Sequence, residues 1–238
     1  MAKGPGMVYC LAFDADDTLW HNESLFAITQ EQVSNLLRPY VDEATLGSQL
    51  LKTEKRNLRL FGYGVKGFTL SMIETAIEVS QGRVTAREIQ TILDAGKGLL
   101  SHPIELLPHV RETLEELNGS YNLMMITKGD LYHQESRIAA SGLGDLFSSI
   151  EVVSEKDPQT YRKILTRYHL EPDAFVMVGN SLRSDILPVV ELGARAIYIP
   201  YEITWEHETA DASQANPELW RQLASIRDVP RLLPEFLP

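Results

Sequence analysis

The chain has 238 residues, of which 44% are hydrophobic and 23% are charged, a composition typical of a globular protein with a packed core. A net charge of −11 argues against a nucleic-acid-binding surface or an anionic membrane face, but not against a small anionic substrate. No stretch approaches the roughly eighteen apolar residues of a membrane span, and the single cysteine, Cys10, allows no intramolecular disulfide. With an apolar stretch at 7–13 too short for a signal peptide, we expect a cytoplasmic protein.

Short apolar runs, most of them separated by segments of helical spacing, recur along the chain. These runs are residues 7–13, 121–127, 149–154, 174–179 and 195–200. They are continuous or nearly so, as in strands that are buried on both faces of a parallel sheet. The alternation of such strands with helices predicts an α/β fold, a doubly wound, Rossmann-like parallel sheet.

About a hundred residues separate the first two runs, and they contain apolar positions at helical spacing without a strong strand. We therefore predict an inserted, all-helical subdomain over residues 21–103. The α/β core then comprises residues 1–20 and 104–238. The tail, 205–238, is polar at first, and we expect helical packing elements in WRQLASI and PRLLPEFLP.

Two features of the insertion resemble binding motifs. Gly62, Gly64 and Gly67 match the dinucleotide-binding pattern G-x-G-x-x-G, but a charged, helix-like segment precedes them instead of a buried strand. We predict a flexible loop between two helices. Lys52, Arg56 and Arg59 would share a helical face, which is either a solvated face or a wall that attracts anions.

Polar residues follow four of the predicted strands. They are Asp14, Asp16, Asp17 and Thr18; Thr127, Lys128, Gly129 and Asp130; Glu155, Lys156 and Asp157; and Gly179, Asn180, Ser181 and Asp185. Parallel α/β sheets bind ligands at the carboxyl ends of their strands. We therefore expect these groups to converge at one edge of the sheet. Asp17 and Thr18 are expected to form the turn that directs Asp14 and Asp16.

This set resembles the four motifs of the haloacid dehalogenase superfamily. DADDT matches D-x-D-x-T, ITKGD resembles the second motif, Lys156 in SEKDP the motif lysine, and GNSLRSD the fourth motif. The helical insertion resembles the α-helical cap of the family. Asn180 lies where many relatives carry a second acid, and Lys128 where many have Asn.

The resemblance implies a Mg²⁺-dependent phosphomonoester hydrolase that acts on a small phosphorylated metabolite. Asp14 would attack phosphorus to form an aspartyl-phosphate, and Asp16 would serve as general acid and then as base. The phosphate-binding residues would be Thr127, Lys128, Gly129 and Lys156. The Mg²⁺ ligands would be Asp14, the Asp16 carbonyl, Asp185 and Asn180. Dehalogenating relatives lack the acid at Asp16, so its presence favours phosphoester hydrolysis.

Other functions stay open at this point. The same motifs occur with phosphomutase and phosphonate hydrolase chemistry, and the fold could also serve as a non-catalytic module that binds a phospho-ligand. Phe61, Tyr63 and Lys66 are our candidates for substrate specificity. We expect no nucleic-acid or membrane partner, and a monomer or homodimer.

Overall fold

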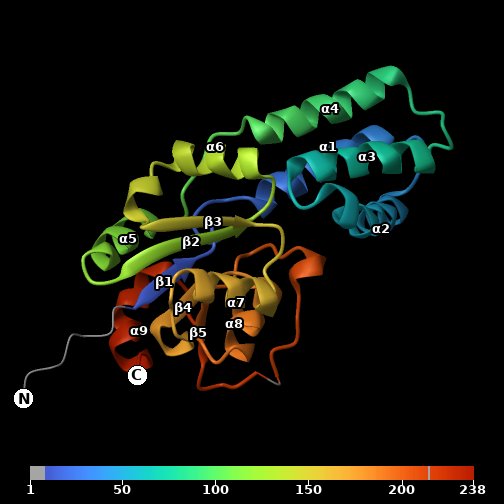
Figure 1. Ribbon diagram of the computed structural model, residues 1–238. Helices are drawn as coiled ribbons and strands as arrows, with labels where there is room; N and C mark the ends of the chain where they lie inside the picture. Colours follow the sequence, from blue (N-terminus) through green and yellow to red (C-terminus); the bar gives the residue numbers. More distant parts are fainter. Residues whose placement is uncertain (1–8, 214) are drawn as a thin grey trace, which may run out of the picture. The chain divides into compact units, whose positions relative to one another are not determined.

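The computed structural model describes residues 9–213 and 215–238, whose contacts divide the chain into two units (Figure 1). The first unit contains the described residues within 9–21, 104–128 and 136–238. The second unit contains residues 22–103 together with 129–135. Residues 129–135 were predicted to belong to the α/β core, whereas their contacts group them with the inserted helices.

The first unit is built on a six-stranded, entirely parallel sheet with the strand order β3-β2-β1-β4-β5-β6. Its strands are β1 (Cys10–Phe13), β2 (Asn122–Lys128), β3 (Ser149–Val153), β4 (Phe175–Gly179), β5 (Arg195–Tyr198) and β6 (Trp220–Gln222). The predicted doubly wound parallel α/β sheet is confirmed. Residues 7 and 8 of the first predicted strand lie outside the described residues.

Alternate residues of the central strands enter two different hydrophobic cores. Leu11 and Phe13 of β1 belong to the core that contains residues of α5 (Val110–Asn118), α9 (Val229–Phe236) and the C-terminal half of α6 (Leu131–Ser141). Cys10 and Ala12 belong to the opposite core, with α7 (Pro158–Arg167) and α8 (Leu187–Glu191) (Figure 1). Both faces of the sheet are therefore covered, which explains the continuous apolar runs in the sequence.

The tail departs from prediction at one point. Trp220–Gln222 form strand β6 instead of a helix, and Ala196 and Tyr198 of β5 are paired with Trp220 and Gln222. The exposed edge of β5 supplies backbone hydrogen-bonding groups that a short segment satisfies by pairing, and this tertiary contact overrides local helical spacing. The prediction of a helix in WRQLASI was therefore wrong for these three residues. The predicted element in PRLLPEFLP is present as α9.

Short helical segments connect the larger elements of the first unit. They are Gly144–Leu146, Pro172–Ala174, the π-helical turn Leu182–Ile186, Glu206–Glu208 and Ile226–Asp228.

The inserted unit consists of α1 (Glu23–Leu37), α2 (Glu43–Phe61), α3 (Val65–Val79) and α4 (Ala86–Leu100). The four helices share one hydrophobic core, which is separate from the two cores of the sheet. Leu37, Leu50, Met72 and Ile92 belong to it. Local signals fix two of the helix starts. Asp42 accepts a hydrogen bond from the Thr45 amide at 2.9 Å, and Thr85 forms a reciprocal capping box with Glu88. The predicted all-helical insertion is confirmed.

The loop in the glycine-rich stretch is shorter than predicted. Gly62 and Gly64 have φ angles of +70° and +114°, which glycine adopts without strain, and they turn the chain between α2 and α3. Val65, Lys66 and Gly67 already belong to α3, and Val65 is buried in the helical core. The prediction of a flexible loop was wrong for these three residues because burial of Val65 extends the helix.

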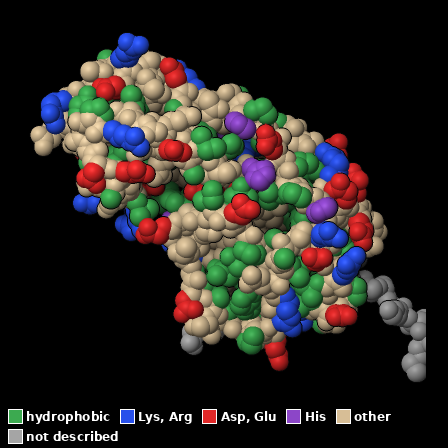
Figure 2. All heavy atoms as spheres, turned by 180° about the vertical axis from the view of Figure 1, so that it is seen from behind, with side chains coloured by type: hydrophobic (Ala, Val, Ile, Leu, Met, Phe, Trp, Pro, Cys, Tyr) green, Lys and Arg blue, Asp and Glu red, His purple; other side chains and the backbone are tan. Residues whose placement is uncertain are grey.

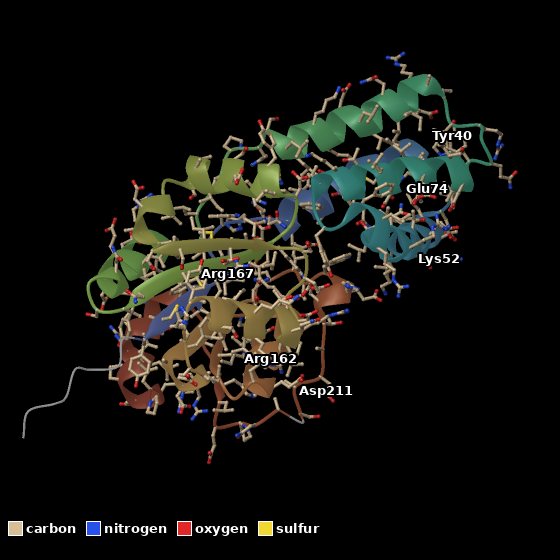
Figure 3. The ribbon with its side chains drawn as sticks, in the orientation of Figure 1. Tyr40, Lys52, Glu74, Arg162, Arg167 and Asp211 are labelled. Atoms are coloured by element: carbon tan, nitrogen blue, oxygen red, sulfur yellow. The ribbon has the colours of Figure 1, made fainter. Side chains whose placement is uncertain are left out.

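Charges of both signs are interspersed on the surface. Arg56 of α2 lies 2.9 Å from Glu74 and 3.1 Å from Glu78 of α3, and Figure 3 places Lys52 and Glu74 on these two helices. The candidate basic face is therefore neutralised in part by acids of the neighbouring helix. On the face shown in Figure 2, Lys and Arg side chains likewise alternate with Asp and Glu. Within residues 9–213 and 215–238, every helix is too short or too polar to cross a membrane.

Candidate active site

The acidic stretch after β1 forms a tight turn that holds Asp14 against the sheet. The Asp14 amide donates to the Val178 carbonyl of β4 at 2.9 Å, which continues the parallel pairing by one residue. The chain then reverses, because the Leu19 amide donates to the Ala15 carbonyl at 2.8 Å and Asp17 adopts a left-handed φ of +61°. Asp14 is thereby fixed at the carboxyl end of β1, where a ligand can reach it.

Lys156 joins two carboxylates from different strand ends. Its Nζ donates to Asp14 Oδ1 and, at 2.8 Å, to Asp185 Oδ1. The second oxygen of Asp185 accepts from the Ser181 amide at 3.0 Å. A Cβ atom at Gly179 would lie only 2.3 Å from Asp185 Cγ, so glycine is required at the end of β4 for this arrangement. Three of the predicted site residues are thus brought together.

Burial controls the charge state of this cluster. It raises the pKa of Asp14 to about 7, although the Lys156 charge opposes the shift. For Lys156, burial favours the neutral amine, but the carboxylates of Asp14 and Asp185 outweigh it and hold the pKa above its usual value. Lys156 is therefore a permanent cation at neutral pH, and Asp14 depends on a neighbouring cation to stay ionised.

Asp16 is held by two partners that were not among the predicted site residues. Its Oδ1 accepts from Trp20 Nε1 at 2.7 Å and lies 3.0 Å from Arg137 NH1. Arg137 is itself buried and donates to the His21 carbonyl at 3.1 Å. Trp20 could have been found, since it lies four residues after Asp16. Arg137 lies inside α6, and no local pattern connects it to the acidic turn.

Asp14 and two other polar groups, the Asp16 carbonyl and the Asn180 amide, converge in a way that fits a hard cation. One terminal atom of the Asn180 side-chain amide lies 3.1 Å from Asp14 Oδ2 and 3.3 Å from the Asp16 carbonyl oxygen. In the absence of metal this atom is the amide nitrogen, which donates a hydrogen bond to both oxygens. Rotation of the amide by 180° would present a third oxygen, and all-oxygen ligand sets suit Mg²⁺.

Acidic side chains alone do not make this candidate metal centre. Among the described residues, no group of three His, Cys, Asp or Glu side chains is placed to hold a metal ion. The donors available are one carboxylate, one main-chain carbonyl and one amide. Asp185 lies beside them with both carboxylate oxygens already hydrogen-bonded.

The predicted phosphate-binding residues at the end of β2 differ in their surroundings. Thr127 is buried at the end of the strand, and Gly129 has a φ of +148°. Lys128 Nζ donates to Ser184 Oγ at 2.8 Å and to Glu208 Oε1 at 2.5 Å. Lys128 therefore contacts the turn after β4 and Glu208, which was not among the predicted site residues.

The specificity candidates Phe61, Tyr63 and Lys66 belong to the second unit. Lys66 Nζ forms an ion pair with Asp130 at 2.9 Å in that unit, and Phe61 is exposed.

Fold and site together define an α/β enzyme whose candidate chemistry centres on a buried aspartate at the carboxyl edge of a parallel sheet. The family model described as haloacid dehalogenase-like hydrolase matches residues 9–193, and the chain belongs to this family of hydrolases. The family predicted from the four motifs is confirmed.

Relatives of known structure and name agree with this assignment. A haloacid dehalogenase-like family hydrolase from Xanthomonas campestris is 42% identical, with a TM-score of 0.87 over 99% of this chain and 94% of that one. Glyceraldehyde 3-phosphate phosphatase of Pyrococcus furiosus is 27% identical over 79% of each chain. Human N-acylneuraminate-9-phosphatase is 22% identical over 97% of this chain and 95% of its own.

Proposed function

We propose that the protein is a Mg²⁺-dependent phosphatase that hydrolyses a small phosphorylated metabolite through an aspartyl-phosphate. The observation that carries the proposal is the buried Asp14 carboxylate, with Lys156 at one oxygen and Thr18 at the other, the latter 3.3 Å away. Two relatives named as phosphatases of small phosphorylated compounds support the same reaction class.

The first half-reaction uses Asp14 and Asp16. An oxygen of Asp14 attacks phosphorus while the bond to the leaving oxygen breaks, and Asp16 supplies the proton that this oxygen requires. Lys156 orients the nucleophile and offsets negative charge on the phosphoryl group. Thr127, Lys128 and the backbone at Gly129 are the proposed phosphoryl-binding groups.

The second half-reaction regenerates the free carboxylate. Asp16 accepts a proton from water as the water oxygen attacks phosphorus, and the bond between phosphorus and Asp14 breaks to release inorganic phosphate.

Bound Mg²⁺ would supply charge neutralisation for the phosphoryl oxygens and for Asp14. Asp14, the Asp16 carbonyl and Asn180 are the residues that would hold the ion, with Asp185 beside them. The acid at Asp16 is the feature that favours phosphoester hydrolysis over dehalogenation.

The test is release of phosphate from p-nitrophenyl phosphate and from a panel that includes glyceraldehyde 3-phosphate and N-acylneuraminate 9-phosphate. We expect turnover with Mg²⁺ and none with a chelator. Asp14→Asn should abolish turnover with an unchanged circular dichroism spectrum. Asp173→Asn, a change at an exposed aspartate of the same unit, is the matched control and should behave as the wild type. Absence of Mg²⁺-dependent turnover on the whole panel would refute the proposal.

A chemical test of the intermediate is independent of substrate identity. Rapid acid quenching during turnover should leave a phosphoryl group on the peptide that contains Asp14, detectable by mass spectrometry. Phosphorylation of another residue, or of none under single-turnover conditions, would exclude Asp14 as the nucleophile.

A further inference from the structure

Glu208 is a buried acid that the reaction described above does not use. It ends the short helix Glu206–Glu208 in the segment that connects β5 to β6, the same segment that carries Asp211 in Figure 3. The Glu208 side chain is only 14% exposed. A carboxylate so enclosed has to be matched by hydrogen bonds and opposite charge, since burial alone would destabilise it.

Both oxygens of Glu208 are occupied by groups from two other strand ends. Oε2 accepts from Ser181 Oγ and from Ser184 Oγ, each at 2.5 Å. Oε1 accepts from Lys128 Nζ at 2.5 Å, and the same Nζ donates to Ser184 Oγ at 2.8 Å. Lys128, Ser184 and Glu208 thus form a closed triangle of hydrogen bonds.

The two serines are adjacent in sequence to two site residues: Asn180, a candidate metal ligand, and Asp185, which binds Lys156. Ser181 lies between Asn180 and the π-helical turn, and Ser184 directly precedes Asp185. Within the turn, the Ser181 amide donates to Asp185 Oδ2 and the Ser184 amide donates to Ser181 Oγ, both at 3.0 Å. π-Helical turns are rare and occur frequently at functional sites. Glu208 holds this turn from outside through the hydroxyl groups of Ser181 and Ser184.

The charge of Glu208 is well stabilised. Burial would raise its pKa, but the charge of Lys128 and the three hydrogen bonds together lower the pKa to about 2. Lys128 lies at the end of β2 and is only 15% exposed, so Glu208 also neutralises a largely buried cation.

We propose that Glu208 is a positioning residue of the candidate metal centre, which holds the turn carrying Asn180 and Asp185 through the hydroxyl groups of Ser181 and Ser184. This inference rests on the metal site of the proposed function. In this role Glu208 does not contact the substrate. The consequence is that loss of its carboxylate weakens Mg²⁺ binding before it affects the chemical step.

The experiment is a calorimetric titration of the full chain with Mg²⁺, which requires no turnover. Glu208→Gln should raise the Kd for Mg²⁺ by about 10- to 100-fold, as is typical when groups behind metal ligands are changed. Glu202→Gln removes the same charge from an exposed position of the same segment and should change Kd less than about twofold. Wild-type Mg²⁺ affinity in Glu208→Gln would overturn the inference.

A second comparison separates positioning from charge. Glu208→Asp keeps the carboxylate charge but shortens the side chain by one methylene group, so it can no longer reach both Ser181 Oγ and Ser184 Oγ. Positioning predicts that Glu208→Asp also weakens Mg²⁺ binding, whereas an acid that acts through its charge alone would keep the wild-type affinity. Wild-type Mg²⁺ affinity in Glu208→Asp would refute the positioning role.

Two further readouts complete the test. Should Glu208→Gln fail to fold, Ser184→Ala removes one of the supporting hydroxyl groups without a change of charge, and we expect it to weaken Mg²⁺ binding as well. If Glu208→Gln is active, saturating Mg²⁺ should restore most of its kcat for p-nitrophenyl phosphate. A loss that Mg²⁺ does not relieve contradicts the inference. A wild-type protein that binds Mg²⁺ without hydrolysing any phosphomonoester would refute the proposed function alone.

Discussion

Replacement of Lys156 by Met tests whether the buried cation stabilises the fold as well as the reaction. Lys156 is 3% exposed and bridges Asp14 and Asp185, so its removal leaves two buried carboxylates without a shared partner. The Nζ–Oδ1 distance of 2.8 Å to Asp185 corresponds to an attraction of about 6 kcal/mol at an effective dielectric constant of about 20. Part of this is offset because the ammonium group no longer has to be desolvated, and breaking such a pair costs about 3–5 kcal/mol in all.

The assay is thermal unfolding in the presence of a chelator. For a chain of this size, about 1 kcal/mol shifts Tm by roughly 2–4 °C, so Lys156→Met should lower Tm by roughly 6–20 °C. Lys163→Met, at an exposed position on α7, is the control and should stay within about 0.5 kcal/mol of the wild type.

A double variant decides whether the loss comes from the unpaired carboxylates. Adding Asp185→Asn to Lys156→Met removes one of the two uncompensated charges and should recover about half of the lost stability, because replacing a buried pair as a whole costs little. A Tm for Lys156→Met within about 2 °C of the wild type would refute the reasoning. So would a double variant that is no more stable than Lys156→Met.

Three other predictions follow from the contacts described above. Lys66→Ala and Tyr63→Ala should change the ranking of phosphorylated substrates more than turnover of p-nitrophenyl phosphate, and equal losses on all substrates would contradict a specificity role. Because the Lys66–Asp130 pair is exposed, Lys66→Ala should cost less than about 1 kcal/mol of stability. The pKa of Glu208 is lowered from 4.5 to about 2, so its charge stabilises the fold above pH 4.5, and this contribution of about 3 kcal/mol disappears as the pH falls towards 2. The difference in unfolding free energy between wild type and Glu208→Gln should therefore shrink over that range, and a constant difference would argue against a charged Glu208. Finally, Mg²⁺ should raise Tm and a chelator should reverse the increase. An unchanged Tm would contradict metal binding by Asp14, Asp16 and Asn180.

The sheet could be predicted from the sequence because its central strands are covered on both sides. Cys10–Phe13, Leu123–Ile126 and Phe175–Gly179 read as continuous apolar runs for that physical reason. Strand β6 has no such signal, since two of its three residues are exposed and only pairing with β5 defines it. Its position at the sheet edge therefore could not be derived from periodicity.

The site could be predicted to the extent that it lies at strand ends. Asp14, Lys156 and Asp185 each follow a predicted strand, and parallel strands end at one edge, so their meeting follows from topology. Arg137 and Glu208 could not be found in this way. Arg137 lies inside α6, and Glu208 lies in a polar segment without strand or helix periodicity, 80 residues after its partner Lys128.

The missed residues change how the charges of the site balance. Each of three buried or nearly buried cations is already engaged with a carboxylate: Lys156 with Asp14 and Asp185, Arg137 with Asp16, and Lys128 with Glu208. Since Lys156 is shared by two acids, the carboxylates outnumber the cations that face them. A phosphate dianion that entered this site alone would meet net negative charge, which strongly disfavours binding in a buried environment. A divalent cation would reverse this balance while using oxygens of Asp14, Asp16 and Asn180. The charge arrangement therefore gives a reason, independent of family resemblance, to expect that phosphate binding and Mg²⁺ binding are coupled in this protein.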